Sequence, residues 1–455
     1  MQTFFALLLM SAAITVPPEL LSRIAATRSV GKRVASELWP GWDAAATPLG
    51  VVQRDQYIVV AGAATMPAPF TTYPGPEPVF VAPPTTSLGN LKIALVAAED
   101  MLGSAGSVEA VEVGIHALFR VHELKIAPRK FADMQILLWG QYPDFSPRNR
   151  VLLQMEATAL HDGVLATSEE AQRKYVAEFL GYRTERRKEM PPEISRYESA
   201  EESSEGLASY IEYRMLESAF PDRADLRKQR LVQLAYLSNL PRERERERFY
   251  LLGMAEALML DRLRPGWKQE FESTDAFLDG LLDKVVPATP ASKAWGALLG
   301  EEQREEARRE AEGTARIGVM LSKGRKVVIE VAAAREVKDK IKLRGLNPNL
   351  MVQLTPNHTV FSYLMLDLDD MRLEFAGVPV VYEKQQDAFW CMLPDDVVTK
   401  ALKDMSDKLT LEGRGFKLQF ENMEVSQRGK EIRIRTATVP EKKAPFKPEF
   451  VKPKP

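Results

Sequence analysis

The chain has almost no cysteine and very little histidine. Its 455 residues include a single cysteine, Cys391, so no disulfide can form within the chain and no cysteine cluster can hold zinc. Only four histidines occur, His116, His122, His161 and His358, so any metal site must depend largely on carboxylates. Disulfide scaffolds and cysteine-ligated zinc domains are therefore excluded.

An excess of charge of either sign is also missing. The chain has 61 Lys and Arg against 63 Asp and Glu, a net charge of −2, which argues against a generic nucleic-acid binder. Its composition, 45% hydrophobic and 27% charged, is that of a globular protein, and its length suggests two or three domains. No P-loop, dinucleotide fingerprint or nucleophile elbow is present.

Long hydrophobic runs are absent apart from the N-terminus. Residues 1–16, "MQTFFALLLMSAAITV", contain an apolar run that is too short to span a bilayer and matches the apolar region of an export signal. Small residues at 11–13 offer a cleavage site, whereas the absence of Lys and Arg leaves a buried N-terminal helix as the alternative. We expect an exported protein, periplasmic, envelope-bound or secreted, with no integral membrane span after the signal is removed.

The hydrophobic pattern predicts an α+β protein with a mostly helical core. Residues 17–106 have strand-like runs at 50–62 and 90–100 around a proline-dense stretch, 66–86, that we expect to be a surface loop. A helical core follows at 107–290, then a charged helical linker at 291–313, a β-rich, sandwich-like domain at 314–437 and a disordered Pro/Lys tail at 438–455. The helices are expected near 107–126, 147–164, 168–188, 192–218, 223–238, 241–263, 274–285 and 291–312.

The segment 114–126, "GIHALFRVHELKI", approaches a zinc-peptidase motif twice. A helical H-E-x-x-H places two imidazoles one turn apart with a general-base Glu beside the first. His116 is followed by Ala117 instead of Glu and by Arg120 instead of the second His, whereas the motif that starts at His122 lacks its second His. Helical spacing puts His116, Arg120 and Glu123 on one face and His122 on another. Taken alone, this pattern is more typical of an ordinary packed helix.

A second segment, "ESSEGLASYIEY" at 202–213, resembles the helix that supplies the third ligand, a Glu, in gluzincin metallopeptidases. Gly206 and Ala208 would allow this helix to approach another closely. Three further segments occur in a matching order: "LWPGWDAAATPLGV", "VLLQMEATAL", which contains Glu156, and "YLLGMAEALMLDRLRPGWK". Together they resemble a group of exported bacterial proteins with a gluzincin-like core, over roughly residues 35–285.

The resemblance implies a role for each position of the degenerate site. The group's first motif commonly reads H-E-x-F-H-x-x-Q. Alignment on its Phe places His116 at the first zinc ligand, Ala117 at the general base and Arg120 at the second ligand. Glu123 then falls on the Gln position and Glu205 on the third ligand. The two departures, at 117 and 120, affect the positions that peptidase chemistry depends on most.

These departures predict a catalytically inactive site. A peptidase zinc needs three protein ligands and an open water position, and only His116 and Glu205 remain as metal ligands. Alanine cannot take a proton from zinc-bound water, and the permanent charge of Arg120 would repel the ion. We therefore expect Arg120 to replace the metal by pairing with Glu205, with Glu156 as a further candidate partner.

The expected function is that of a pseudo-peptidase, without a cofactor, that binds a peptide, a protein or a cell-envelope component, or that acts as a scaffold. One alternative is an active zinc hydrolase in which Glu123, His122 or Glu156 joins His116 and Glu205 as the third ligand. Another is a purely structural envelope protein.

Overall fold

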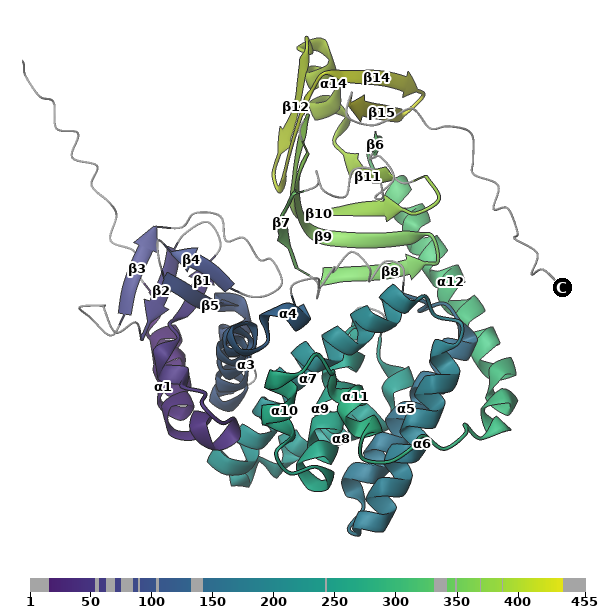
Figure 1. Ribbon diagram of the computed structural model, residues 1–455. Helices are drawn as coiled ribbons and strands as arrows, with labels where there is room; N and C mark the ends of the chain where they lie inside the picture. The colour runs from purple at the N-terminus through teal and green to yellow at the C-terminus, as the bar shows by residue number, and fades with distance from the viewer. Residues whose placement is uncertain are drawn as a thin grey trace, which may run out of the picture. The chain divides into compact units, whose positions relative to one another are not determined.

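The protein is an α+β chain that divides into two compact units, residues 1–308 and 309–455, as seen in a computed structural model (Figure 1). The structure describes residues 16–53, 57–62, 70–74, 85–88, 91–103, 106–131, 142–241, 244–330, 342–347, 350–368, 370–386 and 388–436. All but the last residue of the predicted export signal, and the whole predicted tail, lie outside these residues. The expected fold class, a helical core with an N-terminal sheet and a β-rich C-terminal region, is confirmed.

The N-terminal region begins with a helix that the sequence pattern did not predict. Helix α1 occupies Pro18–Leu38, inside the stretch 17–106 that we expected to hold only strands and loops. Proline at the first helical position and apolar residues at helical spacing, among them Leu20, Ile24, Val34 and Leu38, account for it. The expectation of strands and loops here was wrong, because this periodicity decides the local structure despite the prolines nearby.

A five-stranded sheet follows α1 in the order β3-β2-β1-β5-β4. Its strands are β1 (Leu49–Gln53), β2 (Tyr57–Ala61), β3 (Phe70–Pro74), β4 (Thr85–Leu88) and β5 (Leu91–Ala97). Strands β1 and β5 run parallel, and the other pairs are antiparallel. Most of β3 and β4 comes from the proline-dense stretch that we expected to be a loop. Both are edge strands, where proline is tolerated because one side of the strand makes no ladder hydrogen bonds.

The helices of the first unit follow the predicted order. They are α2 (Ala98–Leu102), α3 (Ser107–Ile126), α4 (Pro128–Phe131), α5 (Pro147–Leu165), α6 (Glu169–Arg187), α7 (Pro192–Ala219), α8 (Ala224–Ala235), α9 (Glu247–Leu263), α10 (Trp267–Ser273) and α11 (Leu278–Asp283). A 3-10 helix, η6, follows at Lys293–Leu298. The short helices α2, α4 and α10 were not predicted. Among the predicted helices of this unit, the largest shift is at α9, which starts six residues after the proline at 241 that we expected to begin it. Strong helical periodicity within each segment explains the agreement.

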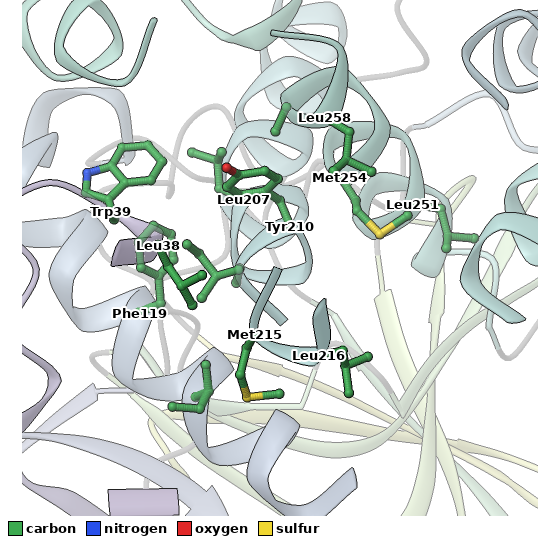
Figure 2. Packing of buried hydrophobic residues seen from close by; sticks show 14 of the residues in the cluster. Leu38, Trp39, Phe119, Leu207, Tyr210, Met215, Leu216, Leu251, Met254 and Leu258 are labelled. Carbon is green, nitrogen blue, oxygen red and sulfur yellow. The ribbon is translucent and has the colours of Figure 1, made fainter. Parts of the chain in front are cut away.

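Helix α7 is the central packing element of this unit. It crosses α9 at two glycines, since a Cβ atom on Gly206 would lie 2.5 Å from the Cα of Gly253. This close approach confirms the role expected for Gly206. Apolar side chains gather around α7, including Leu207 and Tyr210, as Figure 2 shows. Nearby, the Trp39 and Phe119 rings meet edge-on at 5.3 Å between centroids.

Helix α12 (Leu299–Leu321) spans the boundary between the two units. It has the same length as the linker predicted at 291–313 but begins and ends eight residues later, so it includes all but the last residue of the segment 315–322, "ARIGVMLS", which we had expected to form a strand. The apolar residues of this segment recur at helical spacing: Ile317 and Met320 pack against Val328 and Leu354 of the β-rich unit. Among the described residues, no helix has the length and apolarity that a membrane span requires.

The β-rich unit contains one hydrogen-bonded sheet of ten strands. Its elements are β6 (Arg325–Glu330), β7 (Lys342–Leu346), β8 (Met351–Thr355), β9 (His358–Leu368), β10 (Met371–Glu383), β11 (Ala388–Leu393), α14 (Asp395–Lys403), β12 (Lys408–Gly413), β13 (Phe416–Glu421), β14 (Met423–Arg428) and β15 (Glu431–Thr436). The two long strands β9 and β10 pair along their whole length. The first half of β10 also pairs with β13 and its second half with β11, so this hairpin joins the two halves of the sheet. A register shift between Ala376 and Val380, at the positive φ of Gly377, marks the change.

Candidate functional site

The face of α3 that the sequence analysis selected carries a buried ionic site. His116, Arg120 and Glu123 all take part in ion pairs there, as their spacing predicted. His122 lies away from them, next to the Trp42 ring at 6.2 Å and the Phe119 ring at 5.9 Å. Burial lowers the pKa of His122 to about 4, so this imidazole is neutral at physiological pH.

Both ring nitrogens of His116 are occupied by carboxylates of α7. Its Nε2 lies 3.0 Å from Oε2 of Glu205, and its Nδ1 lies 2.7 Å from Oε1 of Glu212. Burial alone would lower the pKa of His116, but the hydrogen bonds and charges of Glu205 and Glu212 outweigh burial and raise this pKa to about 9. The ring stacks on Tyr250, with 5.8 Å between centroids. At neutral pH His116 is thus a fixed imidazolium.

Arg120 is the most deeply buried cation of this site, with 1% of its side chain exposed. Its Nη1 donates to Oε2 of Glu123 at 2.6 Å, and its Nη2 lies 3.8 Å from Oε1 of Glu205. The predicted pairing with Glu205 is therefore present, but Glu123 is the closer partner. Burial raises the pKa of Glu123 to about 8, against the opposing charge of Arg120.

Further ion pairs extend the site in two directions. On one side Arg246, just before α9, pairs with Glu201 and lies 3.3 Å from Oε1 of Glu205. On the other side Arg230 of α8 lies 2.6 Å from both Glu112 and Glu212. We call the whole set the α3–α7 ionic chain; its members are Glu112, His116, Arg120, Glu123, Glu201, Glu205, Glu212, Arg230 and Arg246.

Three cations surround Glu205, the expected third zinc ligand. Burial alone would raise its pKa, but Arg120, His116 and Arg246 together lower this pKa well below the usual range of a carboxyl group. Glu205 is thus a carboxylate whose charge is already neutralised by the protein. Ala117, at the expected position of the general base, is buried and has no titratable group.

These residues do not fit a zinc ion. A zinc ligand must direct a free nitrogen or oxygen at the metal from about 2 Å, whereas Nε2 of His116 and Oε2 of Glu205 are hydrogen-bonded to each other. The guanidinium groups of Arg120 and Arg246 would place two positive charges beside the ion. Within the described part of the chain, no group of three or more His, Cys, Asp and Glu side chains has the geometry for a metal ion. No catalytic step through a metal follows from this arrangement.

Glu156, the further candidate for pairing with Arg120, belongs to a different site. It accepts hydrogen bonds from Arg183 and Arg186 of α6, and its side chain is fully buried. We call this second set the α6 arginine cluster; its members are Arg183, Arg186 and Arg187 with Glu156, Glu198, Glu202, Glu256 and Asp279. The expected link between Glu156 and Arg120 is therefore wrong, because α6 supplies closer guanidinium groups.

The α6 arginine cluster has more carboxylates than guanidinium groups. Burial raises the pKa of Glu256 to about 7, whereas Arg186 and Arg187 overcome the effect of burial and lower the pKa of Glu198 well below its usual range. Protons on some of its members therefore complete the charge balance. The sequence analysis did not predict this cluster, although the four glutamates between 198 and 205 in α7 could have indicated it. Glu198 and Glu202 belong to this cluster, whereas Glu201 and Glu205 belong to the α3–α7 ionic chain.

Comparisons with protein-family models, with curated proteins and with solved structures returned no match for this chain.

Proposed function

We propose that this chain is an exported, metallopeptidase-like protein that has lost catalysis and acts as a binding or scaffold protein. One observation carries the proposal: the buried guanidinium of Arg120, held by Glu123 and Glu205, lies beside the residues that would otherwise hold zinc. A fixed internal cation provides the positive charge that a metal ion would have supplied, so the surrounding carboxylates need no metal for charge balance.

The filled interior favours a scaffold role for the first unit. Side chains of the site are nearly inaccessible, with Arg120 1%, Glu123 0% and Glu205 7% exposed. A peptidase instead needs a cleft that admits substrate to a water-binding metal. Binding of a peptide, a protein or an envelope component would then use outer surfaces of the protein, not the buried pair of Arg120 and Glu123.

Zinc binding provides the direct test. Protein purified without chelator is expected to contain far less than one zinc per chain by elemental analysis, and zinc titration by calorimetry should give no tight binding. The variant Arg120→His, alone and combined with Ala117→Glu, tests whether the lost residues suffice to restore the site. Arg214→His is a matched control, since it adds a histidine at a half-exposed position of α7.

The two outcomes separate the candidates clearly. Weak zinc binding by the wild type with tight binding by the Ala117→Glu and Arg120→His double variant supports descent from a metal site and loss of its function. About one zinc per wild-type chain, with hydrolysis that a chelator abolishes and zinc restores, would refute the proposal and establish the zinc hydrolase.

A further inference from the structure

Helix α8 buries few of its residues fully, although Leu226 and Leu231 pack, partly buried, against the core of the first unit. Only one of its 12 residues, Leu234, is buried, whereas 13 of the 17 residues of α9 are buried. Val232 is 46% exposed, and Tyr236, directly after the helix, is 61% exposed. A helix with so few buried apolar contacts depends on polar contacts to stay in place, and such elements open before the rest of a domain does.

Arg230 supplies the shortest of these polar contacts. Its Nη2 lies 2.6 Å from Oε1 of Glu112 on α3 and 2.6 Å from Oε2 of Glu212 on α7, so one guanidinium joins α8 to two other helices. Arg227, one turn earlier, comes only within 3.8 Å of Glu217. Charge-assisted hydrogen bonds at the shorter distance are much the stronger, so Arg230 dominates the attachment.

Arg230 lies at the solvent end of the α3–α7 ionic chain. The exposed fraction of the side chain rises from 0% at Glu123 and 1% at Arg120 to 9% at Glu212 and 17% at His116, and reaches 20% at Arg230. Removal of Arg230 would therefore expose the outer carboxylates first and His116 next, while Arg120 would stay covered.

The two ends of α8 are held differently. At the C-terminal end, Gln154 of α5 donates to the carbonyl of Ala235 at 2.8 Å and accepts from the amide of Ser238 at 2.7 Å. Leu234 and Leu237 are buried there. This end is therefore held by apolar contacts and hydrogen bonds, whereas the part with Arg230 has ion pairs beside the partly buried Leu226 and Leu231. Such a division allows the helix to swing about its C-terminal end.

We propose that α8 is a hinged lid, which Arg230 clamps over the outer end of the α3–α7 ionic chain. A guanidinium or ammonium group of a binding partner that replaces Arg230 between Glu112 and Glu212 releases the lid and uncovers His116. The inference rests on the proposed non-catalytic role, because it treats the site as a place of contact and not of reaction. It adds that His116 becomes accessible only when α8 moves, and that a guanidinium or ammonium group of the partner causes this movement.

Peptide-resolved hydrogen exchange of Arg230→Ala tests the clamp, with Arg227→Ala as the matched control on the same helix. We expect amide exchange in α8 to become about tenfold faster in Arg230→Ala, with α5 and α6 unchanged, and to change by less than about twofold in Arg227→Ala. Methylguanidinium added to Arg230→Ala should leave this exchange fast, because a free guanidinium can pair with Glu112 and Glu212 but is not attached to α8. Equal exchange in both variants, or a return of α8 to the wild-type exchange rate with methylguanidinium, would overturn the proposal.

Wild-type protein provides a test that does not depend on how the variant folds. Arginine amide should accelerate exchange in α8, while sodium chloride at equal ionic strength should do so less. No difference between the two additives would also overturn the lid. This outcome is independent of the zinc titration, so failure of the lid and failure of the proposed function remain distinguishable.

Discussion

Replacement of Arg120 by alanine should destabilise the first unit strongly. The guanidinium is 1% exposed and its partner Glu123 is 0% exposed, so the variant leaves a carboxyl group buried without its closest cation. Breaking such a buried pair costs about 3–5 kcal/mol. Glu205 retains its ion pairs with His116 and Arg246, so most of the lost stabilisation is that of Glu123. Because the pKa of Glu123 is raised to about 8, this carboxyl group already holds a proton at pH 7 in the wild type, which places the expected cost near the lower limit, about 3 kcal/mol.

The same reasoning predicts a pH dependence for this variant. Above about pH 8 the Glu123 carboxyl group of the wild type loses its proton next to Arg120, whereas in Arg120→Ala it must stay protonated. The difference in unfolding free energy should therefore grow by about 1.4 kcal/mol per pH unit above that pH.

Denaturant unfolding followed by tryptophan fluorescence measures this difference, since Trp39, Trp42 and Trp267 are buried in the first unit. Arg244→Ala is the control, because Arg244 is 48% exposed in its pair with Glu247 and should contribute less than about 1 kcal/mol. Replacement of both Arg120 and Glu123 by methionine should recover most of the loss. A cost below about 1 kcal/mol for Arg120→Ala at both pH 7 and pH 9 would refute the charge-replacement argument.

Three further predictions concern the helix crossing, the imidazolium and the second cluster. Gly206→Ala should lower the free energy of unfolding, measured by thermal unfolding, by about 1–3 kcal/mol or more, because the added Cβ would collide with α9. Gly280→Ala should not lower it in this way, since no atom lies nearer than 3.9 Å to the added Cβ. The pKa of His116 in the folded protein, about 9, exceeds the ordinary value of 6.5, so the stability that its protonation contributes is complete below pH 6.5 and is lost as pH rises through 9. In His116→Gln the free energy of unfolding should therefore depend less on pH between these two values. Glu256→Gln should cost less than about 1 kcal/mol at pH 6 because Glu256 holds a proton there, whereas Glu198→Gln should cost about 3 kcal/mol by the same assay.

The helical periodicity of the chain made much of the fold predictable. Helices α3, α5, α6 and α7 begin and end within one residue of their expected limits, because strong apolar periodicity and caps such as Ser146 and Ser168 act locally. The prediction was wrong where tertiary contacts decide the local structure. Helix α1 lies next to prolines, and β3 and β4 are the edge strands of their sheet. The end of α12 was misassigned because a short apolar run fits a strand and a helix equally well.

The candidate site was partly predictable for the same reason. Spacing alone put His116, Arg120 and Glu123 on one face of α3, and the structure keeps them together. Spacing could not choose the partner of a long charged side chain. We expected Glu205 as the partner of Arg120 and Glu156 as a further candidate; of these two, only Glu205 is within reach of Arg120, at 3.8 Å.

The sequence by itself determined the secondary structure of the helical core, the side of α3 that carries charge, and the lack of a proton-accepting group at 117 and of a metal ligand at 120. These follow from local spacing and from the chemistry of single side chains. Only the tertiary structure decided which cation meets which carboxylate, that α6 supplies a second set of arginines, and that Arg230 holds α8 in place. Buried charges are stabilised only by partners within a few ångströms, and residues that lie tens of positions apart come that close only when the chain folds.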